Sequence, residues 1–182
     1  LNTAYASDGI TGLGNEAATL TDTSLSASGL NTLDDNTTGS IDASTITTLT
    51  GTAGAINSAY SSDGITGLGN EAVTLTDTSL SVSGLNTLDS NTTGSIDANS
   101  ITQFSGNAAD INTTITATGI TTATDYNVTV NDNPTLAQLI TLNNDTTGSI
   151  TLSVTSDNLT GSMSDLLTAF SGSITTYSGN LT

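Results

Sequence analysis

The sequence predicts a repeat solenoid of stacked coils, each about 27 residues long and mainly β with one short helix (an α/β solenoid). An all-β helix is the alternative. The leading observation is a tandem repeat, because residues 1–55 align without gaps on residues 56–110 at 41 identical positions. One such coil cannot bury its own apolar edge, whereas stacked copies bury a continuous one.

A weaker half-repeat lies within this tandem repeat and predicts the length of the coil. Its marker is a glycine that is followed at once or after one further residue by isoleucine. At the recurring places this marker is found at Gly9, Gly39, Gly64, Gly94, Gly119 and Gly148. Two of them fall in each repeat unit, so each unit is expected to form two coils.

The tandem repeat also predicts how the chain is divided. Residues 1–55 and 56–110 are two repeat units of two coils each, and residues 111–182 form either a diverged third unit or a cap. The order of the residues is kept along with the composition, so low-complexity bias does not explain the match.

Each coil is expected to contain a strand and a helix. The segment EAVTLTD alternates Val73 and Leu75 with polar residues, which is the period of a strand with one buried face. TAGAINSAY and SASGLNTLD carry apolar residues at helical spacing, the first behind Thr52 as a candidate N-cap. NPTLAQLITL predicts a helix capped by Asn133. The glycine after each helix is expected to be its left-handed stop.

Composition excludes several classes of function. The chain has 17 acidic residues, no Lys, Arg or His, and a formal charge of −17. Nucleic acids and anionic membrane surfaces are excluded as partners, because both are bound through basic residues. No apolar run approaches the roughly 20 residues of a membrane span, so we expect no membrane insertion. Without His, Lys, Cys or Arg to act as base or nucleophile, we expect no catalytic site and no enzyme.

Two sets of residues recur at matching places and predict internal ladders. One set is an asparagine that resembles the asparagine position of leucine-rich repeats, where stacked side chains satisfy backbone groups; ordinary helix-surface residues are the alternative. Its members are Asn31, Asn57, Asn86 and Asn112. The other set is an apolar residue flanked by hydroxyl side chains, which we expect to form a buried column. Its members are Leu20, Ile46, Leu75 and Ile101.

Acidic and hydroxyl residues suggest two further roles. Stacked coils would align like charges in columns, which calcium could screen. The candidate ligands are Asp22, Asp77, Asp42 and Asp97. Solvated surface charge is the alternative, since the chain lacks both the RTX nonapeptide and an EF-hand loop. We expect no other cofactor. The threonines around the apolar column could also form an ice-binding array.

The phrases GITGLGNEAVTLTD, LNTLDSNTTGSIDA and TLTGTAGAINSAY resemble the tandem repeats of giant bacterial surface proteins, especially those of marine cyanobacteria and of type I-secreted adhesins. The resemblance covers residues 1–120 well and implies an extracellular location. We therefore expect a structural repeat segment of an extracellular fibre or cell-surface layer, assembled by coil stacking. Its partners would be flanking repeats or copies of itself, head to tail. The alternatives are the stalk of a secreted calcium-dependent adhesin and, third, the ice-binding threonine array.

Overall fold

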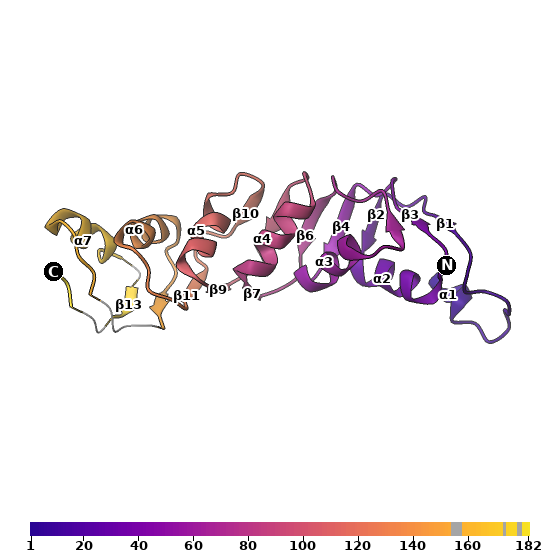
Figure 1. Ribbon diagram of the computed structural model, residues 1–182, viewed down its shortest axis with the longest axis horizontal. Helices are drawn as coiled ribbons and strands as arrows, with labels where there is room; N and C mark the ends of the chain where they lie inside the picture. Colours follow the sequence, from indigo (N-terminus) through magenta and orange to yellow (C-terminus); the bar gives the residue numbers. More distant parts are fainter. Residues whose placement is uncertain (154–157, 173, 178–179) are drawn as a thin grey trace. The chain divides into compact units, whose positions relative to one another are not determined.

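The computed structural model describes residues 1–153, 158–172, 174–177 and 180–182. Its helices follow one another along the chain and are separated by strands (Figure 1). They are α1 (Asn2–Tyr5), α2 (Ala27–Asn36), α3 (Ala53–Ser61), α4 (Val82–Asn91), α5 (Ala108–Thr116), α6 (Leu136–Asp145) and α7 (Met163–Ala169). Among the described residues, none of these helices is long and apolar enough to cross a bilayer.

The strands form three parallel sheets. Sheet A has the order β1-β3-β5, with β1 (Ala18–Thr19), β3 (Ile41–Asp42) and β5 (Ile65–Thr66). Sheet B has the order β10-β8-β6-β4-β2, with β2 (Ser24–Ser26), β4 (Thr48–Gly51), β6 (Ala72–Leu75), β8 (Ile96–Ala98) and β10 (Ile120–Thr122). Sheet C has the order β13-β12-β11-β9-β7, with β7 (Ser79–Ser81), β9 (Gln103–Gly106), β11 (Asn127–Val130), β12 (Ile150–Leu152) and β13 (Ile174–Thr176).

This arrangement corrects the predicted fold class. Within the described part of the chain, three parallel sheets combine with seven helices in an α/β fold. The mainly β repeat solenoid with a short helix per coil is therefore wrong, and so is the all-β helix. Among the described elements, every helix except α1 is longer than any of the strands, which are short throughout.

The physical reason is that strands and helices recur with different steps along the chain. Leu25, Leu49 and Val73 are partners on adjacent strands and follow one another at an even interval. Helices α2, α3 and α4 begin at Ala27, Ala53 and Val82, and these intervals are longer and unequal. The strands and the helices therefore do not repeat together along the chain, and a coil of constant length does not describe both series.

The same mismatch moves each repeat into a new sheet. Strand β7 is the sequence equivalent of β2 in the second repeat unit, and β9 is that of β4, so strands of sheet B have their equivalents in sheet C. Likewise, β3 of sheet A corresponds to β8 of sheet B. The repeat thus gives three sheets of related sequence, not one continuous ladder.

The chain divides into two compact units, and neither coincides with a repeat unit of the sequence. Unit 1 comprises Leu1–Thr76 and Thr87–Asp97, and unit 2 comprises Asp77–Asn86 and Ala98–Thr182. In unit 1, helix α2 packs against α3, and both contact strand β4. Leu30, Leu49 and Ile56 are completely buried there and form the core of this unit.

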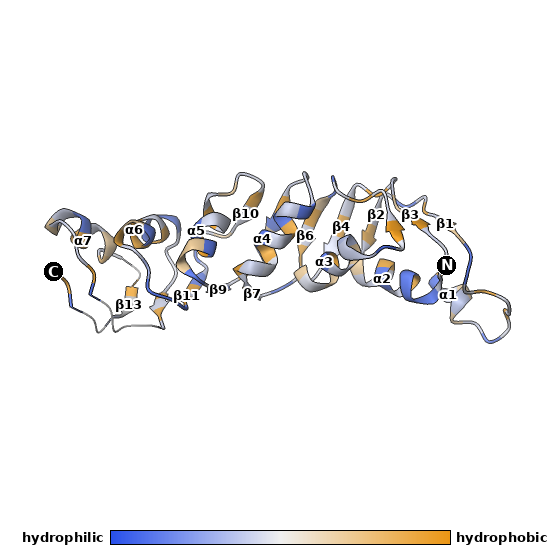
Figure 2. Ribbon diagram, viewed as in Figure 1, coloured by the Kyte–Doolittle hydropathy of each residue, from blue (hydrophilic) through white to orange (hydrophobic). Residues whose placement is uncertain are grey.

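In unit 2, helix α5 packs against α6, and α6 packs against α7. Its core includes Phe104 and Tyr126, whose rings meet edge to face with centroids 5.0 Å apart. Figure 2 shows the distribution of apolar residues along the chain. Orange apolar residues occur in the strands, and the helices carry both orange and blue residues along their turns.

Several local predictions are confirmed. Val73 and Leu75 are the buried residues of β6, and helix α3 begins after Thr52, whose hydroxyl accepts the N–H of Ala55 at 3.2 Å. The predicted cap at Asn133 is wrong, because α6 begins after Thr135, which forms a capping box with Gln138.

The predicted left-handed glycine stops are also wrong. The residues that end α2, α3 and α5 are in extended conformations, and the positive-φ glycines lie elsewhere.

Candidate functional site at the repeat junctions

The predicted asparagines occupy the fifth position of helices α2, α3, α4 and α5. Three of them donate from Nδ2 to a backbone carbonyl near the start of the next helix. The bonds are Asn31 to Ala55 at 2.9 Å, Asn86 to Asp110 at 3.1 Å and Asn112 to Gln138 at 3.4 Å. Asn57 accepts a bond on Oδ1 from Asn91 at 3.4 Å. These side chains join neighbouring helices.

Asn2 belongs to the same series, although it was not predicted from the sequence. It donates to the carbonyl of Gly29 in α2 at 2.9 Å. The alignment of the two repeat units, which places Asn2 on Asn57, was the signal that could have identified it. The series ends at α6 and α7, whose fifth residues are Ile140 and Leu167.

A second junction is formed by the tripeptide Thr-Thr-Gly that follows α2, α4 and α6. In the copy after α4, the buried hydroxyl of Thr92 donates to the carbonyl of Glu71 at 2.9 Å and accepts the N–H of Gly94 at 3.0 Å. The N–H of Thr93 donates to the carbonyl of Gly69 at 2.9 Å. The tripeptide therefore ties the end of a helix to a segment that lies well before that helix in the chain.

The other two copies of the tripeptide make the same contacts. Thr37 donates to the carbonyl of Glu16 at 2.8 Å, and Thr146 donates to that of Tyr126 at 2.6 Å. The glycine of each copy lies so close to this accepting peptide that a Cβ would overlap it. None of these roles was predicted from the sequence, because hydroxyl residues are common throughout the chain.

We expect Thr92→Val to destabilise the fold by about 1–3 kcal/mol, because it leaves the Glu71 carbonyl and the Gly94 N–H unpaired in the interior. Thr93→Val is the matched control, since the Thr93 side chain is exposed and its hydroxyl makes only a 3.4 Å bond. Urea unfolding of both variants measures the difference. Equal midpoints for the two variants would contradict the assigned role of Thr92.

Glu71 is completely buried and holds the loop that precedes it. Its Oε2 accepts the hydroxyl of Tyr60 at 2.8 Å and the N–H of Gly69 at 2.9 Å. Burial is the main cause that raises the pKa of Tyr60, and the hydrogen bond and charge of Glu71 act in the same direction. Tyr60 therefore stays protonated and remains a donor to Glu71 at neutral pH.

The first repeat contains the same arrangement, and the third contains a variant. Tyr5 donates to Glu16 at 3.1 Å, and the N–H of Gly14, which donates at 2.7 Å, is the main cause that lowers the pKa of Glu16. In the third repeat, Tyr126 takes the place of Glu71 and its hydroxyl donates to Asp145. A carboxylate paired with a tyrosine thus recurs, but the two residues come from different positions.

The predicted apolar residues are buried, but they do not pair with one another across strands. Leu20, Ile46, Leu75 and Ile101 all lie in the cores. In the strand register, however, Leu75 stands opposite Gly51. The residues that do stack in sheet B are Leu25, Leu49, Val73 and Ile96.

The four aspartates considered as calcium ligands do not form charged columns in the strand register. Asp42 stands between Thr19 and Thr66 in sheet A, whereas Asp97 stands beside Thr74 in sheet B. Hydrogen bonds from the Ser44 hydroxyl and N–H lower the pKa of Asp42.

Asp22 and Asp77 use their backbone carbonyls instead, which accept the hydroxyls of Thr45 at 3.1 Å and Ser100 at 2.9 Å. Across the described ranges, no three acidic side chains converge on a metal-sized site.

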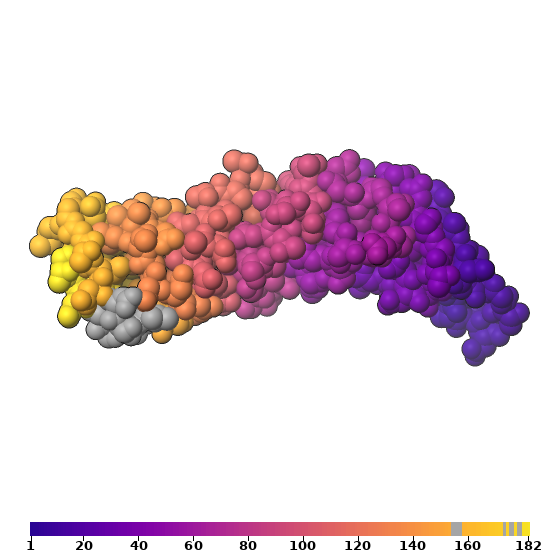
Figure 3. All heavy atoms as spheres, viewed as in Figure 1, coloured from indigo at the N-terminus to yellow at the C-terminus, as the bar shows by residue number. Residues whose placement is uncertain are grey.

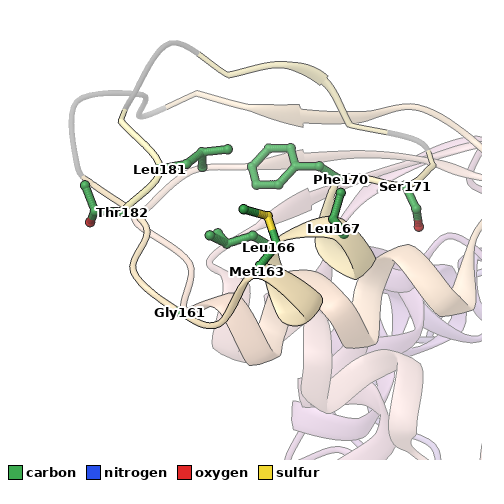
Figure 4. A pocket seen from close by; sticks show the side chains of 8 residues that line it. All are labelled: Gly161, Met163, Leu166, Leu167, Phe170, Ser171, Leu181 and Thr182. Carbon is green, nitrogen blue, oxygen red and sulfur yellow. The ribbon is translucent and has the colours of Figure 1, made fainter.

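An open apolar groove of about 700 Å³ lies beside α7 in unit 2. Figure 4 shows Met163, Phe170 and Leu181 facing one another across it, with Leu166 beside them. Met163 is 73% exposed and Leu167 is 64% exposed. In the space-filling view, the gold atoms of α7 lie at the surface (Figure 3). The groove is therefore apolar and open to solvent.

Comparison with known proteins adds no relative, since no family model, curated protein or solved structure matches the chain. The recurring polar groups at the repeat junctions form hydrogen bonds between parts of the chain that are distant in sequence.

Proposed function

We propose that this chain is a structural repeat segment of an extracellular fibre or cell-surface layer, built by the stacking of repeat units and without a catalytic role. The observation that carries this proposal is that the recurring polar residues form hydrogen bonds between neighbouring helices and loops. Asn31, Asn86 and Asn112, the Thr-Thr-Gly tripeptides and the buried Glu71 all form hydrogen bonds with backbone groups of a neighbouring helix or loop. Because the recurring residues join one part of the repeat to the next, they favour a structural role over catalysis or ligand binding.

Two further features support the proposal. Strands from successive parts of the repeat pair in parallel and in register within sheets B and C. The extracellular setting is supported by the resemblance of residues 1–120 to repeats of giant bacterial surface proteins. A chain of this kind has flanking repeats or further copies of itself as its partners.

The charge of −17 sets the conditions for a test, because copies without any basic side chain repel one another. We expect the isolated chain to form larger species as its concentration rises, and to do so more strongly at high sodium chloride, which screens the repulsion. Multi-angle light scattering over a concentration series at low and high salt measures this, and negative-stain images show whether the species are regular. A chain that stays monomeric at every concentration and salt would contradict the proposal.

A further inference from the structure

The sequence carries a modification signal that the proposed function does not use. Asparagine followed two residues later by serine or threonine, with any residue except proline between them, is the acceptor triplet for N-linked glycosylation. Seven asparagines meet this rule, namely Asn36, Asn91, Asn112, Asn127, Asn144, Asn158 and Asn180. Such triplets arise by chance in a chain rich in Asn and Thr, so the structure has to distinguish usable acceptors from coincidental ones.

Glycan transfer makes two demands on a folded chain. The side-chain amide must reach solvent, because its nitrogen is the atom that bonds to the sugar. The hydroxyl two residues later must also be accessible, because it is the other half of the acceptor signal. Burial or engagement at either place protects a triplet until the chain opens locally.

The triplets at the ends of α2 and α4 meet both demands. Asn36 and Asn91 are the last residues of these helices, and both side chains are exposed. Among the described residues, the side chain of Asn36 makes no hydrogen bond, and that of Asn91 makes only the 3.4 Å bond to Asn57. The hydroxyl residues of the two triplets, Thr38 and Thr93, are exposed as well.

A glycan at these places leaves the repeat junction intact. In the triplet after α4, the middle residue Thr92 is buried and bonds to the carbonyl of Glu71, while the residues on either side of it are exposed. The middle residue of an acceptor triplet is free to vary. The junction and the acceptor signal therefore use different side chains of the same segment. In the third repeat Asp145 stands before the Thr-Thr-Gly tripeptide instead, and it accepts the hydroxyl of Tyr126.

Two other triplets fail one demand each. Asn112 is half-buried, and its Nδ2 already donates to the carbonyl of Gln138, so a glycan on that nitrogen would break the contact between α5 and α6. Asn144 is exposed, but the hydroxyl of Thr146 is buried and donates to the carbonyl of Tyr126 at 2.6 Å. Both triplets are therefore protected in the folded chain.

The remaining triplets are not assigned a role. Asn127 lies in β11, whose backbone is paired with β9 on one side and with β12 on the other. An enzyme that binds its acceptor as a peptide would have to remove this strand from sheet C. Asn158 and Asn180 border stretches outside the described ranges.

We propose that Asn36 and Asn91, and not Asn112 or Asn144, accept an N-linked oligosaccharide from a lipid-diphosphate carrier. The amide nitrogen bonds to C1 of the first sugar, and the bond between C1 and the diphosphate oxygen breaks. The amide gives up one proton, the lipid diphosphate leaves, and nothing is oxidised or reduced. This modification rests on the proposed function, because N-linked glycans are added to exported chains.

The first experiment examines the chain as its own cells export it. N-glycans are removed enzymatically in heavy-oxygen water, which converts a glycosylated asparagine to labelled aspartate, and peptides are analysed by mass spectrometry. We expect the label at Asn36 and Asn91 and not at Asn112 or Asn144. Absence of label at Asn36 and Asn91 would overturn the proposal, and so would equal label at all four asparagines.

The second experiment measures transfer by a purified single-subunit oligosaccharyltransferase with its lipid-linked donor. The rate at each asparagine of the folded chain is divided by the rate for a synthetic peptide with the same triplet. We expect this ratio to be at least about tenfold higher at Asn36 and Asn91 than at Asn112 and Asn144, because the latter require local opening. Equal ratios at the four asparagines would overturn the proposal, as would a peptide with the Asn91 triplet that is not accepted.

A pair of variants tests the role of the hydroxyl. Thr93 is exposed, so its replacement should leave the fold intact, which circular dichroism checks. We expect Thr93→Val to abolish transfer at Asn91 and to leave Asn36 unaffected, whereas Thr93→Ser keeps the hydroxyl and should still be modified at Asn91. Transfer at Asn91 of Thr93→Val equal to that of the wild type would contradict the assignment. Association is measured by light scattering of the unmodified chain, so the proposed function stands or falls separately.

Discussion

Leu49→Asp is expected to lower the stability of the chain by on the order of 4 kcal/mol or more. Leu49 is completely buried in β4, where its neighbours in the strand register are Leu25 and Val73. An aspartate at this position would be a buried charge, and the sequence contains no Lys, Arg or His to pair with it. The carboxylate must therefore be protonated, or the sheet must open to let water reach it.

Thr48→Asp is the matched control for this prediction. Thr48 precedes Leu49 in the same strand, so its side chain points to the opposite face, and it is only half-buried. We expect its replacement to change the free energy of unfolding by less than about 1 kcal/mol. Thermal and urea unfolding of both variants give the comparison. If Leu49→Asp melts at the temperature of the control, the Leu25–Leu49–Val73 column is not part of the core.

The sequence was sufficient to predict individual elements where a periodic pattern meets a strong local signal. Helix α3 combines apolar residues at helical spacing with Thr52, whose hydroxyl caps the first turn. Strand β6 alternates buried and polar residues around Val73 and Leu75. At α6 two residues compete as cap, and Thr135 is used in place of Asn133 because Gln138 completes a capping box.

The arrangement of the sheets could not be predicted in the same way. Comparing the sequence with itself detects the tandem repeat, and dividing each unit in two suggests coils of equal length. Strand pairing depends instead on backbone spacing, which brings Leu25 against Leu49 and not Leu20 against Ile46. Leu20 and Ile46 are buried although they do not pair with each other across strands. The local apolar pattern therefore predicts burial, whereas the register depends on which strands from distant parts of the chain pair with one another.

The junction residues show a similar limit. Asn31 could be predicted as a joining residue because it recurs at one position of successive helices. Thr92 has many threonines around it, and only its burial against the Glu71 carbonyl distinguishes it from exposed Thr93. The recurring glycine is visible in the sequence, but helix termination is the wrong role for it, because sequence does not reveal which backbone lies beside it. Its role follows from a contact with a residue far away in the chain.

Gly94→Ala is expected to destabilise the chain by about 3 kcal/mol, because the added methyl group would overlap backbone atoms. A Cβ at Gly94 would overlap the carbonyl of Glu71 and approach the N atom of Ala72. Neither group can move without breaking a local bond, since the Glu71 carbonyl accepts Thr92 and the Ala72 N–H donates to Thr47. The cost does not come from the backbone conformation, because Gly94 is not among the glycines with positive φ.

Gly54→Ala separates this steric cost from the general effect of replacing glycine. Gly54 lies in α3, and nothing stands within 4 Å of a Cβ built there. Alanine favours helix over glycine by about 0.5–1 kcal/mol, so this variant should be as stable as the wild type or slightly more stable. Urea unfolding of the two variants should therefore show shifts of opposite sign, and Gly39→Ala, at the equivalent place in the first repeat, should behave like Gly94→Ala. Stabilisation by Gly94→Ala would mean that the chain after α4 does not approach Glu71, and the Thr-Thr-Gly tripeptide would lose its role in joining the repeats.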